Sequence, residues 1–181
     1  MTAELRDTLA RVLLPGVAIA VILFVARLRG MSFRDDLGLQ LPSWKEGLFW
    51  LILFVVLAAI EEVLQKIMGL PAPERWGAKY TAEIKAVRVF AIAVLAPLSE
   101  ELLFRGMLYR MIEKTVLGRV GAIAITSAAF AALHYQYGVR GLPFTSMDGV
   151  FFGMVRCSTR STILTIFLHA LGNSYAAYQR L

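Results

Sequence analysis

Apolar stretches long enough to cross a bilayer recur along this chain, and they restrict its fold more than any other feature. A helix needs about 20 residues to cross the hydrocarbon core of a membrane. Candidate spans cover residues 9–28, 47–64, 86–112, 120–135, 148–156 and 161–178. The fifth is too short to cross alone unless its helix extends to either side or is re-entrant. The sequence therefore predicts an all-α, polytopic transmembrane helix bundle of about six spans.

Polar segments separate these candidate spans. Residues 70–88 carry two prolines, a tryptophan and a tyrosine, which is typical of a loop followed by an interfacial helix. Residues 136–147 contain glycine and proline and are expected to form a loop. Arginines follow the first span with no clear cleavage site, so we expect a retained anchor rather than a signal peptide.

Composition agrees with a membrane protein. Hydrophobic residues make up 58% of the 181-residue chain and charged residues 18%, against about 25% charged in ordinary globular domains. This balance excludes a disordered chain, a disulfide-stapled secreted module and a soluble nucleic-acid binder. The net charge of +6 is best explained by Lys and Arg that flank spans and face lipid headgroups. The single cysteine, Cys157, has no partner for a disulfide or a cysteine-based metal motif.

The distribution of positive charge does not predict an orientation. Lys and Arg are divided equally between the two sides of a six-span arrangement, so the positive-inside rule favours neither. We expect a multi-pass integral membrane protein with the bilayer and a membrane protein or peptide as its partners, and no nucleic acid.

Ionisable residues within apolar spans usually line a functional site, because a charged side chain at the bilayer centre costs about 2.5–3.5 kcal/mol on insertion scales. The first cluster is Glu100, Glu101 and Arg105. Glu101 and Arg105 are four residues apart and can pair on one helix face. Glu100 lies about 100° round the helix and cannot share that face. The spacing thus predicts that Arg105 keeps Glu101 ionised, while Glu100 is free to accept a proton.

The other two clusters contain both histidines of the chain. His134 closes the fourth span, four residues after Phe130. His169 and Asn173 are also four apart in the last span, so one helix face presents an imidazole and a carboxamide. Both groups can donate hydrogen bonds, as an oxyanion on a peptide carbonyl requires.

Each cluster alone has a structural interpretation. Glu101 and Arg105 could form a simple salt bridge, His134 could be an interfacial histidine, and His169 with Asn173 could join helices by hydrogen bonds. Their occurrence together in three apolar spans favours a functional site. A second acidic pair, Glu61 and Glu62 with a lysine in the arginine position, ends the second span, and we expect both carboxylates to reach the interface.

In this order the clusters resemble the CPBP family of intramembrane proteases, the CAAX-protease and bacteriocin-processing group also called Abi. The family signature is EExxxR, FxxxH and HxxxN, which the three clusters above match. The flanking residues 96–99, 104–106 and 150–156 are also similar. The resemblance covers residues 89–178, so we expect a catalytic core at 89–181 and an N-terminal transmembrane region at 1–88.

The resemblance implies peptide-bond hydrolysis in or beside a membrane by a glutamate-activated water, in a polar cavity between the motif helices. Glu100 is then the general base, and His134 helps to hold the water. His169 and Asn173 stabilise the oxyanion, and Glu101 with Arg105 sets geometry and charge. No cofactor is implied. The substrate is a membrane-embedded or membrane-proximal peptide, of CAAX type or a C-terminal sorting or leader peptide, and a prokaryotic cell membrane is the expected location.

Three alternatives remain open at this point. Two histidines and a glutamate could hold zinc in a metal-dependent protease, although no HExxH pair is present. The chain could also be a non-catalytic bacteriocin-immunity or assembly protein that keeps the fold. A small proton-coupled transporter is a third alternative, but the inverted repeat expected there is absent.

Overall fold

The computed structural model describes residues 2–181, and this part of the chain is helical with no strand. It has six helices, the third of which is long and changes register twice. The helices are α1 (Ala3–Leu28), α2 (Trp44–Ile67), the continuous series α3 (Ala82–Phe90), η2 (Ala91–Leu95), α4 (Ala96–Glu101), η3 (Leu102–Leu108) and α5 (Tyr109–Glu113), then α6 (Gly118–Leu133), α7 (Gly138–Thr159) and α8 (Thr162–Tyr178). The short 3₁₀ turns η1 (Gly77–Lys79) and η4 (Tyr135–Tyr137) lie in connections.

Side-chain caps explain where several of these helices begin. Ser43 and Glu46 form a capping box at the start of α2. Thr2, Thr81 and Ser161 accept from backbone amides at the starts of α1, α3 and α8. Such caps satisfy backbone donors that the first helical turn leaves unpaired.

Two helices, α1 and α2, are long and apolar enough to cross a membrane. They have 26 and 24 residues, and only 11% and 17% of their most apolar segments is buried by the rest of the protein. A core helix of a soluble protein would be mostly buried, so these outward apolar side chains fit a lipid environment. The other four predicted spans do not meet the same criteria of length and hydropathy, and α6 is a shorter apolar helix of 16 residues.

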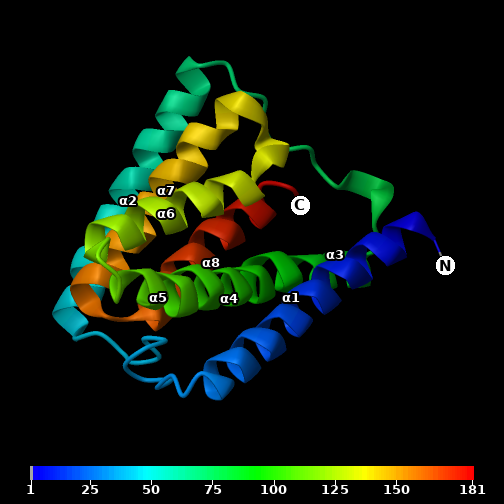
Figure 1. Ribbon diagram of the computed structural model, residues 1–181. Coiled ribbons are helices and arrows are strands. Elements are labelled where there is room, and N and C mark those ends of the chain that lie inside the picture. Colours follow the sequence, from blue (N-terminus) through cyan, green and yellow to red (C-terminus); the bar gives the residue numbers. More distant parts are fainter. Residues whose placement is uncertain (1) are drawn as a thin grey trace.

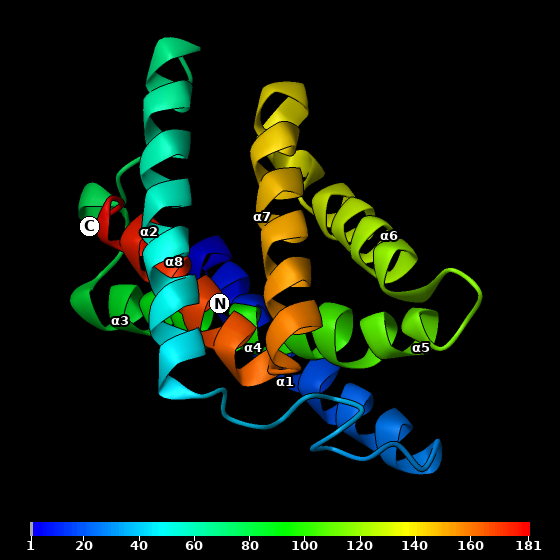
Figure 2. The ribbon, with the colours of Figure 1, turned by 90° about the vertical axis from the view of Figure 1, so that its left-hand side faces the viewer.

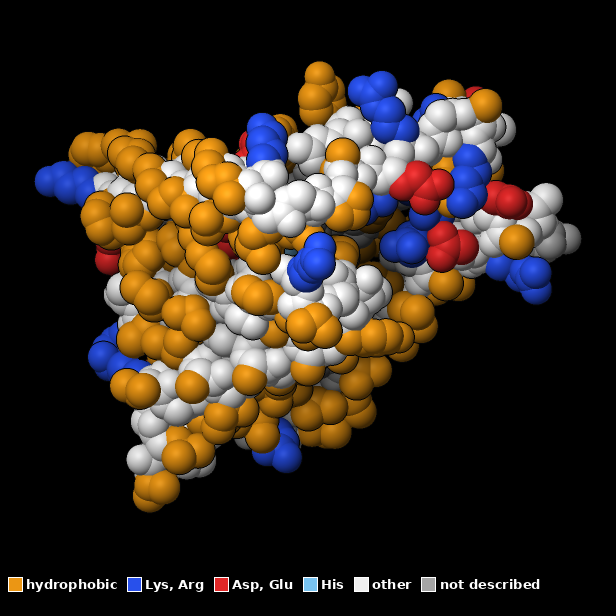
Figure 3. Space-filling view, turned by 90° about the horizontal axis from the view of Figure 1, so that it is seen from above, with side chains coloured by type: hydrophobic (Ala, Val, Ile, Leu, Met, Phe, Trp, Pro, Cys, Tyr) orange, Lys and Arg blue, Asp and Glu red, His pale blue; other side chains and the backbone are white. Residues whose placement is uncertain are grey.

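The connections place successive helix ends on alternating sides of the molecule (Figure 1). The loop between α1 and α2 lies on the same side as the turns after α5 and α7. Figure 2 shows α2 and α7 upright, with the long α3–α5 helix crossing behind them. Hydrophobic side chains cover much of the surface in Figure 3, and a cluster of charged ones gathers at one side.

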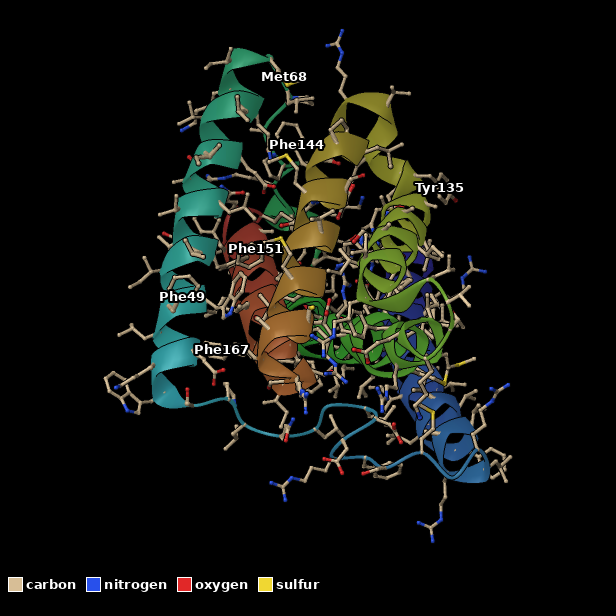
Figure 4. The ribbon with its side chains drawn as sticks, turned by 60° about the vertical axis from the view of Figure 1, so that its left-hand side comes forward. Phe49, Met68, Tyr135, Phe144, Phe151 and Phe167 are labelled. Atoms are coloured by element: carbon tan, nitrogen blue, oxygen red, sulfur yellow. The ribbon has the colours of Figure 1, made fainter. Side chains whose placement is uncertain are left out.

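Aromatic residues fill the space between α2, α7 and α8. The buried cluster comprises Trp50, Phe54, Phe152, Val155, Leu164 and Leu168, and Phe151 packs against it. Phe151 extends from α7 toward α2 (Figure 4), with its ring centroid 5.4 Å from that of Trp50. Contacts of this kind hold membrane helices together by van der Waals packing.

The expected loop at residues 136–147 is mostly helix. Helix α7 begins at Gly138 and continues through Pro143 to Thr159. Pro143 lies near the start of the helix, where one missing backbone donor disturbs little. The short fifth segment is therefore part of a helix of 22 residues.

The interfacial helix expected before the third span does not form a separate element. After η1, Thr81 caps a helix that begins at Ala82 and continues without a break into the motif region. Trp76 and Tyr80 are buried, and the Arg88 guanidinium lies 4.3 Å from the centroid of the Tyr80 ring. The polar connection thus folds against the helix that it precedes.

Candidate active site

The acidic motif lies on the long helix, directly after a π-helical segment. In η2 the amide of Ala96 donates to the carbonyl of Ala91, five residues back, instead of to Ile92. The next donor in this register would be residue 97, but Pro97 has no N–H. The Ile92 carbonyl therefore loses both possible helical partners, and the Asn173 side chain donates to it at 2.9 Å.

A second π-helical segment, η3, follows Glu101. The amide of Tyr109 donates to Phe104 instead of to Arg105. The freed carbonyl of Arg105 accepts from Nε of Arg156, on α7, at 3.0 Å. The acidic motif is thus flanked by two π segments, each held through a free carbonyl by a side chain from another helix, and such segments are frequent at functional sites.

Glu101 and Arg105 form the ion pair that their spacing predicts. Nη1 of Arg105 donates to Oε1 of Glu101 at 3.0 Å, and both side chains are 0% exposed. Nη2 of Arg105 donates to the Gly149 carbonyl of α7 at 2.9 Å. The guanidinium also lies 4.6 Å from the centroid of the Phe130 ring. Two fully buried charges of opposite sign with this geometry hold each other in place.

Glu101 also contacts His169. Its Oε1 lies 2.9 Å from Nδ1 of the imidazole. A carboxylate paired with arginine can only accept, so Nδ1 carries the proton and Nε2 is turned away from Glu101.

His134 is oriented in the same way by the backbone. Its Nδ1 lies 2.8 Å from the Phe130 carbonyl, which can only accept, so Nδ1 is again the donor. The Phe130 ring packs against both histidines, with centroid distances of 4.5 Å to His134 and 5.7 Å to His169. The residue at the first position of FxxxH thus helps to orient both imidazoles.

Glu100 faces the remaining nitrogen of each histidine. Its Oε2 lies 3.8 Å from Nε2 of His134 and 3.8 Å from Nε2 of His169. These separations exceed a direct hydrogen bond, and Oε2 has no hydrogen-bond partner in the protein. The Glu100 side chain is 26% exposed, whereas Glu101 is fully buried. The neighbouring carboxylates therefore have different surroundings.

The two carboxylates approach opposite edges of the His169 ring. Oε1 of Glu101 lies within hydrogen-bond distance of Nδ1, whereas Oε2 of Glu100 lies 3.8 Å from Nε2. Asn173 has no direct contact with Glu100: it lies one helical turn beyond His169 and is bonded to the Ile92 carbonyl.

Sequence reasoning missed three residues around the site. Asp148 of α7 directly precedes Gly149, whose carbonyl accepts from the Arg105 side chain. Arg156 holds the Arg105 carbonyl, and the Tyr137 ring stacks on His134 with a centroid distance of 5.6 Å. In the sequence, Asp148 and Arg156 lie at the two ends of a short apolar segment. Charged residues in these positions could have indicated that they contribute to the site.

The second acidic pair does not behave as expected. Glu62 pairs with Lys66 at 2.7 Å near the end of α2, in agreement with an interfacial position. Glu61 is only 9% exposed, and its Oε1 is buried without a partner. Glu61 shares the buried face of α2 with Trp50 and Phe54, which explains why it is directed into the protein.

Within residues 2–181, no group of three or more His, Cys, Asp or Glu side chains is arranged to hold a metal ion. The convergence of Glu100 with two imidazoles is the principal polar arrangement of the motif helices. It brings together a carboxylate, two oriented imidazoles and, one turn away, a carboxamide.

Comparison with known proteins gives one family. The family model described as type II CAAX prenyl endopeptidase Rce1-like matches residues 82–175, which include all three motifs. Comparison with curated proteins and with solved structures gave no match. The match covers more than half of the chain, from the start of α3 to near the end of α8. The chain belongs to the Rce1-like family of CAAX-type proteases, which is membrane-embedded.

Proposed function

We propose that this protein is an intramembrane endopeptidase that hydrolyses a peptide bond with a water molecule activated by Glu100. The observation that carries the proposal is the position of Glu100 Oε2, 3.8 Å from Nε2 of both His134 and His169. These three polar atoms lie close enough together for one water molecule to contact all of them. Membership of the Rce1-like family supports a protease, and the position of Glu100 beside the two imidazoles supports the glutamate mechanism.

In the proposed reaction Glu100 removes a proton from the bound water. The water oxygen forms a bond to the carbonyl carbon of the substrate, and the carbonyl oxygen becomes an oxyanion. The C–N bond then breaks as Glu100 returns the proton to the leaving nitrogen, so that one water is consumed and a carboxyl and an amine are produced.

His169 and Asn173 are the proposed donors to the oxyanion. With Nδ1 bonded to Glu101, His169 can donate from Nε2 only as an imidazolium, and the buried Glu101 carboxylate is a suitable counterion for that form. Asn173 uses one of its two N–H groups for the Ile92 carbonyl and retains the other.

We further propose that all six helices span the bilayer and enclose a polar cavity between the motif helices. The Glu100 and His134 side chains are partly exposed, at 26% and 15%, while Oε2 of Glu100 itself is buried, so water would reach that atom from within the proposed cavity. The proposed substrate is a membrane-embedded or membrane-proximal peptide, of CAAX type or a C-terminal sorting or leader peptide. In this arrangement residues 89–181 supply the catalytic core and residues 1–88 the N-terminal membrane region.

A comparison of wild type with Glu100→Gln tests the proposal. Each purified protein is incubated with total membrane protein from the source cells, and mass spectrometry identifies new peptide termini. Termini that wild type produces in the presence of a chelator, and that Glu100→Gln does not produce, would support the mechanism. Loss of the wild-type termini on chelation would indicate a metal-dependent protease instead. New termini from both proteins would contradict the role of Glu100, and the absence of new termini from wild type would favour a non-catalytic role.

A further inference from the structure

The loop between α1 and α2 is docked against the end of the catalytic helices. Leu37 is fully buried, and the Gly38 carbonyl accepts from the amide of Thr162 at 2.8 Å. Gly38 has a positive φ of 70°, and a Cβ there would lie 2.7 Å from the Arg160 carbonyl oxygen. Glycine is therefore required both by the backbone conformation and by the close approach.

Arg156 joins this loop to the second π segment. Its Nε donates to the Arg105 carbonyl at 3.0 Å, and its Nη2 donates to the Asp36 carbonyl at 3.0 Å. The residue is 3% exposed, so these carbonyls are its principal partners in place of water. The planar guanidinium fixes the direction of both bonds, as a flexible ammonium cannot.

The two buried arginines form a reciprocal contact between α7 and the π segment. The Arg105 side chain donates to the Gly149 carbonyl of α7, while the Arg156 side chain of α7 donates to the Arg105 carbonyl. The Arg105 backbone and its side chain are thus each fixed to the same neighbouring helix. The Arg105 side chain in turn holds Glu101, which holds His169.

We propose that Arg156 is a positioning residue for the peptidase reaction. It connects the docked loop to the backbone of Arg105, and so maintains the orientation of Glu101 and His169 relative to Glu100. The proposal rests on the proposed function and adds that residues outside the three motifs set the geometry of the site. A displacement of about 1 Å in such a supporting contact can lower catalysis by about a hundredfold.

The test compares Arg156→Gln with Arg156→Lys and with the control Arg160→Gln. Arg160 is the C-cap residue of α7, four residues later, and has an exposed side chain, so its variant matches the loss of charge. The probe is an internally quenched, farnesylated peptide with a CAAX terminus, and kcat and KM are measured per amount of monodisperse folded protein. Hydrogen exchange of residues 102–109 and 31–41 is measured on the same samples.

We expect kcat of Arg156→Gln to fall by at least about tenfold while KM changes by less than about threefold, because the substrate-binding surface is not altered. Arg156→Lys should recover part of the lost kcat, and the kcat of Arg160→Gln should match that of wild type.

Hydrogen exchange of residues 102–109 and 31–41 should accelerate only in the Arg156 variants. Unchanged kcat per folded protein, or unchanged exchange at residues 102–109, would overturn the proposal. If wild type fails to cleave any prenylated or unprenylated probe, the proposed function fails, and exchange alone then decides whether Arg156 fixes the segment.

Discussion

At the scale of single residues, Glu100 and Glu101 are neighbours with different environments. Glu101 is fully buried against Arg105, whereas Glu100 is partly exposed and has an unpartnered oxygen directed at two histidines. The difference follows from adjacent positions on a helix pointing about 100° apart. It separates a carboxylate held in a buried ion pair from one that has an unpartnered oxygen, as the proposed mechanism requires.

This separation predicts opposite effects of two similar substitutions. Glu101→Gln leaves the buried Arg105 charge without its counterion, so it should lower the free energy of unfolding by about 3–5 kcal/mol. Glu100→Gln breaks no ion pair with an arginine or lysine and should change the free energy of unfolding by less than about 1 kcal/mol. Thermal or denaturant unfolding in detergent measures both. Equal destabilisation by the two variants would contradict the assignment.

At the scale of elements, the π segments explain why Asn173 bonds to a backbone carbonyl. The Ile92 carbonyl is free because Pro97 lacks the amide that the π register would otherwise supply. Asn173 satisfies a partly buried acceptor that the helix itself leaves unpaired. This bond also fixes α8 relative to the helix of the acidic motif.

The explanation predicts coupling between Asn173 and Pro97. Asn173→Leu should cost about 1–3 kcal/mol of stability, because it leaves the Ile92 carbonyl unsatisfied. In a Pro97→Ala background the new amide can donate to that carbonyl, so the same change should cost about 1 kcal/mol less. Ser174→Ala, on the exposed side of the same helix, is the control, and its effect on the free energy of unfolding should be the same in both backgrounds. An equal cost of Asn173→Leu in both backgrounds would rule out the coupling.

The loop between α1 and α2 should show a pH-dependent stability. Hydrogen bonds from Arg110, the Ser32 amide and Lys114 hold the pKa of the Asp36 carboxyl well below its usual range. The pKa of aspartate in an unfolded chain is about 3.9. Because the pKa of Asp36 is lower in the folded protein, the ionised carboxyl stabilises the fold at pH values above about 3.9. This stabilisation is lost as the pH falls from that value toward the pKa of the folded state.

Asp36→Asn should therefore lower the free energy of unfolding by roughly 1–2 kcal/mol at pH 7. The difference from wild type should shrink below about pH 4, where Asp36 of the unfolded chain is protonated. Melting temperatures of both proteins between pH 3 and pH 7 provide the measurement, with Asp35→Asn as the control. A difference that stays constant over this range would show that Asp36 does not act through its charge.

At the scale of the whole molecule, the sequence predicted the all-helical class correctly, and the segments that carry the three motifs are helical. Charges in apolar segments are costly, so the sequence alone singled out Glu101, Arg105 and His169, which lie together in the interior. The contacts between helices were not predictable. A π segment inserts one residue and rotates the rest of the helix after it, and this change leaves no spacing signal of its own. For the same reason the partners of the Ile92 and Arg105 carbonyls came from the structure alone.

Two other differences have local causes. Pro143 suggested a loop, but it lies near the start of α7, where helices tolerate proline. Glu61 suggested a helix end at the interface, but it shares the buried face of α2. In both cases the structure depends on where the residue lies in its helix, and the residue type alone did not predict it.

The alternating helix ends predict which loops share a side of the membrane. In a Cys157→Ser background, Leu41→Cys and Thr115→Cys should react with an impermeant maleimide from one side of sealed vesicles. Ala72→Cys and Tyr135→Cys should react only from the other side, because each pair of loops lies at one end of the bundle (Figure 1). Labelling of all four positions from one side would contradict the six-span arrangement.

Steady-state cleavage of the farnesylated CAAX peptide shows whether Glu100 activates the attacking water. Wild type, Glu100→Gln and the control Glu62→Gln are compared with and without a chelator. We expect kcat to fall by at least about a thousandfold in folded Glu100→Gln alone, as loss of a general base would require, and the chelator to have no effect. Activity of Glu100→Gln within about tenfold of wild type would contradict this role of Glu100.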